Sequence, residues 1–323
     1  MDATPAISII IVSYNTRQLL ADCLASIRTY ARSAEIEIIV VDNNSADGSV
    51  EMLRDEFPEV RRIENKNNPG FGVANNQGFA ISRGEFVLLL NSDTVLLEDT
   101  PGKLRDFMLR HPRAGAVAPL VRLMDGTRQP KTYGHLPTAR VVFNQSLLLS
   151  SLFPRSRSFA GIFVEHSFGR EMQVGWISGV CMLIRPEAYA AVDGFDPAFF
   201  LYAEDIDLCR RIVNAGWTIH RIDDHAIKHL CGGSSKSDQI VIRNGVLQQR
   251  NFLRLIDAST GPAGRAFARV SLAAGLAARV ALRGLRLIVR PHGGRLSFHV
   301  SLKCLADILG VAGELDSAHA RRN

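Results

Sequence analysis

The chain has 323 residues, 46% hydrophobic and 22% charged, and these fractions exclude a disordered chain and a fibrous repeat. The length suits two domains, or one large α/β domain with an appendage. The formal net charge is +6, but residues 262–290 hold six arginines and no acid. Of the 38 Lys and Arg, the other 32 balance the 32 Asp and Glu, so no nucleic-acid-binding surface is indicated.

Cysteine usage and apolar run lengths indicate the compartment. The five cysteines are odd in number and form no C-x-x-C pair, which favours a reducing compartment over a disulfide framework or a zinc site. The first apolar run, Ile7 to Val12, is typical of a buried strand and too short for a signal peptide. Since no uncharged apolar stretch reaches about 18 residues, a spanning helix is not supported and we expect a cytoplasmic protein.

The first 120 residues alternate between strand and helix patterns. Predicted strands cover residues 7–12, 37–41, 60–63 and 85–90. Predicted helices cover residues 17–30, 50–57 and 74–82. Short apolar runs separated by helices predict an α/β fold with a mostly parallel sheet covered on both faces. Such sheets bind ligands at the carboxyl ends of their strands.

The rest of the chain is less regular. We expect residues 121–175 to be irregular. Further along we predict a strand over 177–184, a helix over 204–215, a strand over 217–222 and a helix over 240–256. A probable boundary follows at Gly261-Pro262, because glycine and proline mark breaks between segments.

Polar clusters follow three predicted strands. They are Ser13-Tyr14-Asn15, Asp42-Asn43-Asn44-Ser45 and Asn91-Ser92-Asp93. Each could be a simple turn or cap. Because all three lie at the same edge of the predicted sheet, together they favour a polar ligand that carries phosphate or metal.

A glycine-rich turn enters the helix near residue 74. It spans Asn67 to Gly78 and includes Asn68, Gly70 and Asn76. Such a turn exposes backbone N–H groups to an anion, although a capped loop without a ligand is the alternative. A dinucleotide fingerprint is rejected, because that motif follows the first strand and this one follows the third.

Acidic and histidine residues form two further candidate groups. Glu204, Asp205 and Asp207 begin a predicted helix, where acids stabilise the helix dipole or supply a general base. His220, His225 and His229 could be packed residues, or one of them could join Asp93 in a site for a divalent ion.

Six motifs occur in an order that resembles the family-2 glycosyltransferases of the GT-A fold, over about residues 5–255. They are I-V-S-Y-N, V-V-D-N-N-S-A-D-G-S, N-P-G-F-G-V-A-N-N-Q-G, L-L-L-N-S-D, W-I-S-G-V-C-M-L-I-R and F-L-Y-A-E-D-I-D-L-C-R-R. The last form is similar to bacterial rhamnosyltransferase-like enzymes that build cell-surface polysaccharide.

The resemblance implies roles for individual residues. Nucleotide-binding positions would be Ser13, Tyr14, Asn15, Asp42, Asn44, Asn68, Gly70, Asn76, Asn91 and Ser92. Asp93 would bind a metal ion, Mg²⁺ or Mn²⁺, with His229 completing the metal or diphosphate site. Asn91 stands where the family's D-x-D motif has its first aspartate. Asp205 would be the catalytic base, and Glu204 would orient groups around it.

The implied reaction is an inverting, metal-dependent sugar transfer. The expected donor is dTDP-rhamnose, and the acceptor is a glycan or a polyprenyl-diphosphate-linked sugar, with no nucleic acid as partner. A UDP-sugar donor and an inactive glycosyltransferase-like binding module are the alternatives. A sugar nucleotidyltransferase is disfavoured, because Ser13-Tyr14-Asn15-Thr16 is not a glycine-rich basic loop.

The expected domains are a GT-A domain over 1–257 and a basic amphipathic helical extension over 258–323. The nucleotide-binding half would cover about 1–120 and the acceptor half about 121–257. On a helix over 265–290 the six arginines share one arc. That arc is either a solvated face or a contact with anionic lipid, which would place the protein peripherally at the inner face of the cell membrane.

Overall fold

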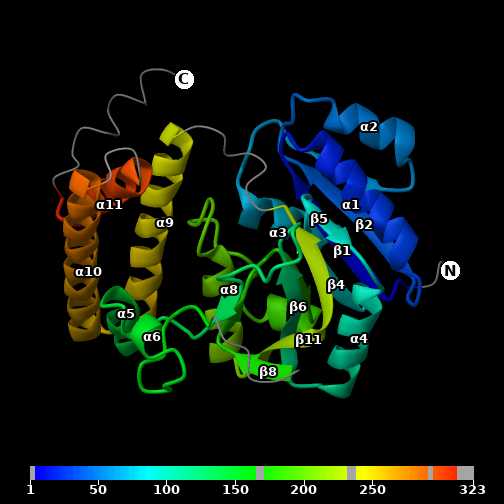
Figure 1. Cartoon of the computed structure of the whole chain (residues 1–323). Coiled ribbons are helices and arrows are strands. Elements are labelled where there is room, and N and C mark those ends of the chain that lie inside the picture. Colours follow the sequence, from blue (N-terminus) through cyan, green and yellow to red (C-terminus); the bar gives the residue numbers. More distant parts are fainter. Residues whose placement is uncertain (1–3, 165–170, 231–237, 290–293, 311–323) are drawn as a thin grey trace. The chain divides into compact units, whose positions relative to one another are not determined.

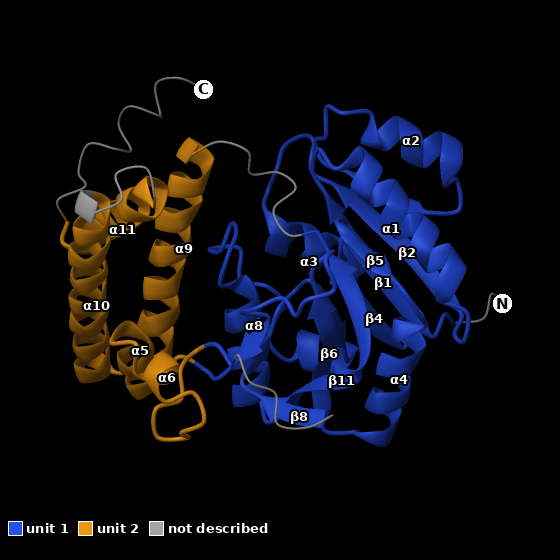
Figure 2. Cartoon of the chain, in the orientation of Figure 1, with its two compact units in different colours: residues 1–136, 163–234 blue, residues 137–162, 235–323 orange. Residues whose placement is uncertain are grey.

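The computed structural model describes residues 4–164, 171–230, 238–289 and 294–310. By contacts the chain divides into two compact units, 1–136 with 163–234 and 137–162 with 235–323 (Figure 2). Unit 1 holds the sheet and unit 2 is helical, as Figure 1 shows. The predicted α/β class with a C-terminal helical extension is confirmed. The units divide the chain differently from the expected boundary at residue 257, since residues 137–162 and 235–257 group with the C-terminal helices.

Unit 1 is built on a mixed sheet. Its strand order is β3-β2-β1-β4-β10-β6-β11-β5, with β8 paired to β11. Pairs β3-β2, β2-β1, β1-β4 and β6-β11 are parallel, and the pairs of β10 with its neighbours are antiparallel. The strands are β1 (Ile7–Ser13), β2 (Ile36–Asp42), β3 (Arg61–Glu64), β4 (Phe86–Asn91), β5 (Thr94–Leu96), β6 (Ala114–Arg122), β8 (Glu171–Val174), β10 (Cys181–Ile184) and β11 (Thr218–His229).

A two-stranded sheet of β7 (Tyr133–Gly134) and β9 (Trp176–Ile177) also belongs to this unit. The helices of unit 1 are α1 (Arg17–Tyr30), α2 (Ser49–Glu56), α3 (Phe71–Ile81), α4 (Thr100–Arg110), α7 (Pro186–Ala190) and α8 (Glu204–Asn214).

Both faces of the central strands are covered, which explains their continuous apolar sequence. Ile9 and Ile11 of β1 lie in one core cluster with residues of α1, α2 and α4. The intervening Ile10 faces α3, where a Cβ on Gly78 would come within 2.6 Å of its Cγ2. Since successive strand side chains point to opposite faces, β1 is buried on both sides and its polar end becomes the base of a site.

Several expected boundaries are wrong. The segment expected as one strand over 177–184 is two strands, because Ser178–Val180 turns between β9 and β10. The strand expected over 217–222 continues as β11 to His229. Residues 121–175 are not simply irregular, since they include α5 (Ala139–Ser146), α6 (Leu149–Leu152) and strands β7 and β8.

Unit 2 joins α5 and α6 to three long helices. These are α9 (Asp238–Ser259), α10 (Pro262–Val289) and α11 (Arg295–Ile308). Within this unit α10 packs against α5 and α11, and Arg250 of α9 pairs with Asp307 of α11 at 2.7 Å. Among the described residues no helix combines the length and apolar character needed to cross a bilayer. Four cysteines are free and buried, and Cys231 lies outside the described residues.

Candidate functional site

A pocket of about 250 Å³ opens at the carboxyl ends of β1 and β4 and beside the start of α3. Six residues predicted from the sequence line it: Tyr14, Asn68, Gly70, Asn91, Ser92 and Asp93. The sequence reasoning missed the other lining residues, which are Val12, Thr16, Leu19, Asn43, Phe71, Phe200 and Leu201. The structure thus brings all three polar clusters, the second through Asn43, and the glycine-rich turn to one cavity.

Hydrogen bonds between the strand ends hold the cavity's polar wall. Ser13 Oγ lies 3.1 Å from Thr16 Oγ1, which donates to Ser92 Oγ at 3.1 Å. Ser13 is fully buried, so it supports the wall and does not line the cavity. Thr16, the link in this chain, could have been found from its place just after the first polar cluster.

A second set of amide contacts joins the end of β2 to the glycine-rich turn. Asn43 Nδ2 donates to Asn68 Oδ1 at 3.2 Å, and the same oxygen accepts from Gly70 N–H at 3.0 Å. Asn65 Nδ2 in turn donates to Asn43 Oδ1 at 2.9 Å. Asn68 therefore shapes the turn that lines the cavity. Asn43 belonged to a recognised cluster but was not singled out.

The loops after β1 and β2 are joined by hydrogen bonds, and each contains an asparagine with left-handed backbone conformation. Asn15 and Asn44 have φ of 54° and 66°, a conformation that asparagine tolerates better than most residues. Asn15 N–H donates to Ser45 Oγ at 2.9 Å, and Asn15 Oδ1 accepts from Ala46 N–H at 2.8 Å. Neither asparagine lines the cavity, so the structure gives Asn15 a part in holding these loops together.

Asp42 ends β2 and is almost fully buried. One carboxylate oxygen accepts from Ser45 N–H at 2.8 Å. The other, Oδ1, has no hydrogen-bond partner among the described residues. A buried acceptor without a donor is costly, so this oxygen suits a hydroxyl or N–H supplied by a ligand.

Asn76 is placed away from the cavity lining. Its Nδ2 donates to Phe195 O at 2.9 Å, and its Oδ1 accepts from Phe195 N–H at 2.9 Å and from Tyr189 O–H. The whole side-chain amide is thereby committed to fixing the segment before α8. Its expected contact with a nucleotide gains no support from this position.

The loop before α8 seats on the glycine-rich turn. Gly70 has φ of 94°, and a Cβ there would lie 2.4 Å from Phe200 O. Phe71 N–H donates to the same carbonyl at 3.2 Å. Only glycine allows this approach, which brings Phe200 and Leu201 to the cavity. The sequence showed these two residues only as part of an apolar segment.

Asp93 and His229, the two predicted metal ligands, meet at the edge of the cavity. His229 Nε2 lies 2.9 Å from Asp93 Oδ1 and 3.3 Å from Asn91 Nδ2. His229 is buried, and its Nδ1 lies 2.8 Å from Gln129 Oε1. Gln129 Oε1 can accept the Nδ1 proton, which would leave a lone pair on Nε2 toward the Asp93 carboxylate. The sequence gave no signal for Gln129.

This donor set suits a divalent cation, because a cation satisfies two acceptors that face each other. Among the described residues no group of three or more His, Cys, Asp and Glu is arranged to hold a metal ion. A Mg²⁺-like ion commonly takes one or two protein ligands and completes its shell with water and substrate phosphates. Asp93 and His229 therefore fit such an ion only together with a phosphate-bearing ligand.

The three carboxylates that begin α8 have different environments. Asp207 is buried and pairs with Arg210 and Arg211, both at 2.7 Å, so it is structural. Asp205 accepts from Gly179 N–H at 3.3 Å and from its neighbour Ile206 N–H at 2.8 Å. Glu204 is buried, and its Oε2 has no hydrogen-bond partner among the described residues.

Burial raises the pKa values of Glu204 and Asp205 together. Burial lifts the pKa of Asp205 to about 6, against the opposing effect of its backbone hydrogen bonds. For Glu204, burial and the charge of Asp205 raise the pKa to about 8. Burial therefore makes this pair of carboxylates more basic than exposed acids.

Strain marks the backbone before these carboxylates. Tyr202 and Ala203 both adopt left-handed φ, 71° and 69°. Two successive non-glycine residues in this region are costly, and such strain clusters at functional sites. The geometry thus supports the prediction that α8 supplies a reactive carboxylate.

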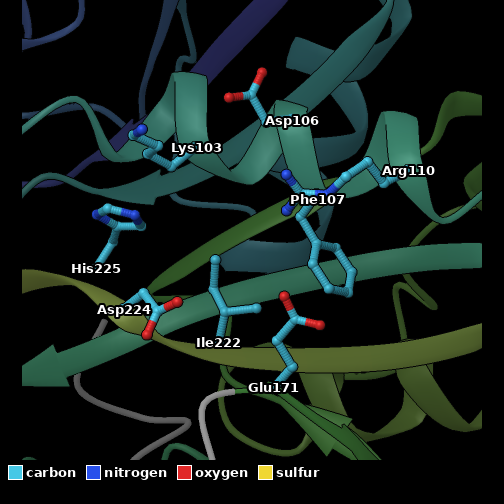
Figure 3. Close-up of a pocket in the computed structure, with 8 residues that line it drawn as sticks. All are labelled: Lys103, Asp106, Phe107, Arg110, Glu171, Ile222, Asp224 and His225. Atoms are coloured by element: carbon cyan, nitrogen blue, oxygen red, sulfur yellow. The ribbon is translucent and has the colours of Figure 1, made fainter.

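A second hollow of about 210 Å³ lies between α4, β8 and β11 (Figure 3). Its rim carries both signs of charge. Lys103, Asp106 and Arg110 come from α4, and Asp224 and His225 come from β11. Of the candidate residues named from the sequence, His225 lines it. Of the other two candidate histidines, His225 pairs with Glu98 at 2.9 Å and His220 contacts Thr218, so neither joins the Asp93 site.

A polar pocket at the strand ends of an α/β sheet lies where proteins of this class bind their ligands. The family model described as "Glycosyl transferase family 2" matches residues 8–188. The chain belongs to this family, and it is a glycosyltransferase that transfers sugars from nucleotide donors.

A curated relative agrees with this assignment, and solved structures share the fold. The "N-acetylglucosaminyl-diphospho-decaprenol L-rhamnosyltransferase" of Mycobacterium tuberculosis is 31% identical over 225 residues, covering 66% of this chain and 72% of the relative. A mannosyltransferase from Pyrobaculum calidifontis, solved with GDP-Man and Mn²⁺, gives a TM-score of 0.57 at 17% identity, over 95% of this chain and 88% of that one. GalNAc-T7, solved with UDP, GalNAc and Mn²⁺, gives 0.55 at 14% identity, over 80% and 48%. These structural likenesses bear on the fold alone.

Proposed function

We propose that the chain is an inverting rhamnosyltransferase that moves rhamnose from dTDP-rhamnose to a hydroxyl of a polyprenyl-diphosphate-linked sugar. The observation that carries the proposal is the pocket at the carboxyl ends of β1 and β4, with the Asp93–His229 pair at its edge. The mycobacterial rhamnosyltransferase supports the choice of sugar and acceptor, because the chain covers 72% of that relative.

Asp205 is the proposed general base. Its raised pKa lets it accept the acceptor hydroxyl's proton, and among the described residues no cationic side chain is paired with it as Arg210 is with Asp207. The hydroxyl then attacks the anomeric carbon on the face opposite the leaving diphosphate. A single displacement inverts the configuration and needs no covalent intermediate.

Asp93 and His229 are the proposed ligands for Mg²⁺ or Mn²⁺, with Asn91 beside them. When bound, such an ion neutralises charge on the diphosphate leaving group. Asp42 Oδ1, buried without a donor, is the proposed acceptor for a nucleoside hydroxyl or base N–H. Asn68 and Gly70 are proposed to hold the turn beside the nucleotide.

We further propose that the enzyme works peripherally at the inner face of the cell membrane, because a polyprenyl-linked acceptor resides in the bilayer. The domain assignment proposed for this activity keeps residues 1–257 as the GT-A domain. The alternatives are a UDP-sugar donor and an inactive binding module.

Thermal stabilisation of the full chain by dTDP, UDP and GDP, each with and without Mn²⁺, tests the proposal. A ligand at a hundred times its dissociation constant adds about 2.7 kcal/mol of stability, which raises the Tm by several degrees. We expect the largest shift with dTDP and Mn²⁺. A preference for UDP or GDP would overturn rhamnose, and no shift with any nucleotide would favour the inactive module.

A further inference from the structure

Contacts within unit 2 fix which side of helix α10 is buried and which side is exposed. The residues that face inward and are buried are Ala268, Ser271, Leu272, Gly275 and Leu276. At Gly275 the fit is close, since a Cβ would lie 2.4 Å from Ser146 O of α5. Phe143 of α5 stacks on Phe267 with ring centroids 5.3 Å apart. These contacts decide which side of α10 points outward.

The outward side is apolar from Ala266 to Leu285. Phe267, Val270, Leu282 and Leu285 are 49%, 68%, 56% and 61% exposed. Exposed alanines fill the positions between them at helical spacing: Ala266, Ala274, Ala277, Ala278 and Ala281. These nine residues are called the outer face of α10. Among the described residues, 11 of the 18 exposed large hydrophobic side chains lie in unit 2, which holds about a third of the chain.

The arginines, in contrast, bind within the unit. Arg269 pairs with Asp257 at 2.6 Å, and Arg279 donates to Gln145 O at 3.2 Å. Arg283 donates to Ser297 O at 2.7 Å. The arginine arc expected to meet lipid therefore turns partly toward α5, α9 and α11. Arg269 and Arg286 remain exposed beside the outer face.

We propose that the outer face of α10 inserts into the interfacial layer of an anionic lipid bilayer. Charge selects this occupant: residues 262–289 contain no acid, and Arg286 is exposed at the border of an apolar stripe. A second copy of the chain fits less well, because a twofold contact between these faces would bring two basic, acid-free helices together. The inference deepens the membrane contact of the proposed function.

Vesicle flotation of the full chain tests the proposal without a sugar donor. We expect binding to phosphatidylglycerol–phosphatidylcholine vesicles and much weaker binding to phosphatidylcholine alone. The double variant Val270→Asn, Leu285→Asn should bind about tenfold more weakly or worse, because burial of apolar side chains drives insertion. The matched control is Leu109→Asn on α4, 48% exposed in unit 1, which should bind like the parent chain.

A second measurement guards against misfolding of the double variant. Leu285→Trp should show a blue-shifted emission on adding anionic vesicles, while Leu109→Trp should not. Unchanged flotation of the double variant, or no shift for Leu285→Trp, would overturn the proposal. So would light scattering that shows a dimer which the double variant abolishes. Nucleotide stabilisation is read separately, so failure here leaves the donor proposal standing.

Discussion

At the scale of single residues, the hydrogen-bond and ion-pair partners of a carboxylate determine whether it is structural or able to accept a proton. Asp207 and Asp205 lie two positions apart on α8, yet two arginines hold Asp207, and backbone N–H groups hold Asp205. The sequence predicted a reactive carboxylate among the three acids. It could not exclude Asp207 from composition alone, since the pairing depends on how α8 is oriented.

Because the pKa of Asp205 is raised, we expect kcat/KM to decrease at low pH. A base must be ionised to accept a proton, so kcat/KM should fall about tenfold per pH unit below about pH 6. Glu204, with its pKa near 8, stays largely protonated over this range. Steady-state kinetics with a synthetic acceptor measure the profile. A rate that stays level down to the ordinary aspartate pKa of about 4 would contradict the assignment.

Gln129 is expected to act as a positioning residue for His229. Its 2.8 Å contact with Nδ1 sets the tautomer that leaves Nε2 toward Asp93. Replacing such a partner usually weakens metal binding about 10- to 100-fold, so Gln129→Leu should weaken Mn²⁺ binding by about that factor. Paramagnetic resonance of free Mn²⁺, titrated with nucleoside diphosphate present, gives the affinity.

The control for this change is Gln173→Leu, on the exposed side of β8. It should bind Mn²⁺ like the parent chain. Equal affinities for both leucine variants would show that Gln129 has no part in positioning His229.

At the scale of elements, the site depends on close approaches between strand ends and loops. Gly70→Ala places a Cβ 2.4 Å from Phe200 O at φ 94°, so it should destabilise the fold by about 1–3 kcal/mol and weaken nucleotide binding. Gly216→Ala has the same φ but nothing within 4 Å, so it isolates the backbone strain. Calorimetry measures the Tm of both variants. Equal losses of Tm would show that the close approach of Phe200 O to Gly70 does not contribute to the destabilisation.

The sequence predicted well those elements whose apolar residues recur with one clear strand or helix spacing. The apolar runs of β1, β2 and β4 and the stripe of α1 are set by burial, which the sequence records directly. The second half of β11 was missed because its polar residues, Asp223 to His225, break the apolar pattern. Helices α5 and α6 are short, and their positions depend on packing of α5 against α10 and of α6 against α5.

The sequence predicted the site residues that directly follow buried strands. It did not predict the residues that reach the site from segments far away in the sequence. Tyr14, Asn91 and Asp93 follow directly from the sheet. Gln129 and Phe200 reach the site from segments whose path the sequence does not specify. Asn76 lay in a recognised motif, but its amide is used by Phe195 and Tyr189.

At the scale of the whole molecule, family membership and the site support one enzyme, and we propose a separate role for each unit. Unit 1 holds every described residue proposed for sugar transfer, and unit 2 holds the outer face of α10. Loss of lipid binding is therefore expected to spare turnover of a water-soluble acceptor.

We propose that Asp205 is the general base of the sugar transfer that this fold and pocket support. Release of nucleoside diphosphate from dTDP-rhamnose, with Mn²⁺ and acceptor, tests it most directly in the parent chain and in Asp205→Asn. We expect the variant to lose about a hundredfold or more in rate while keeping nucleotide stabilisation. A variant that turns over at the parent rate, or a parent chain that binds nucleotide yet releases none from any donor, would contradict the account.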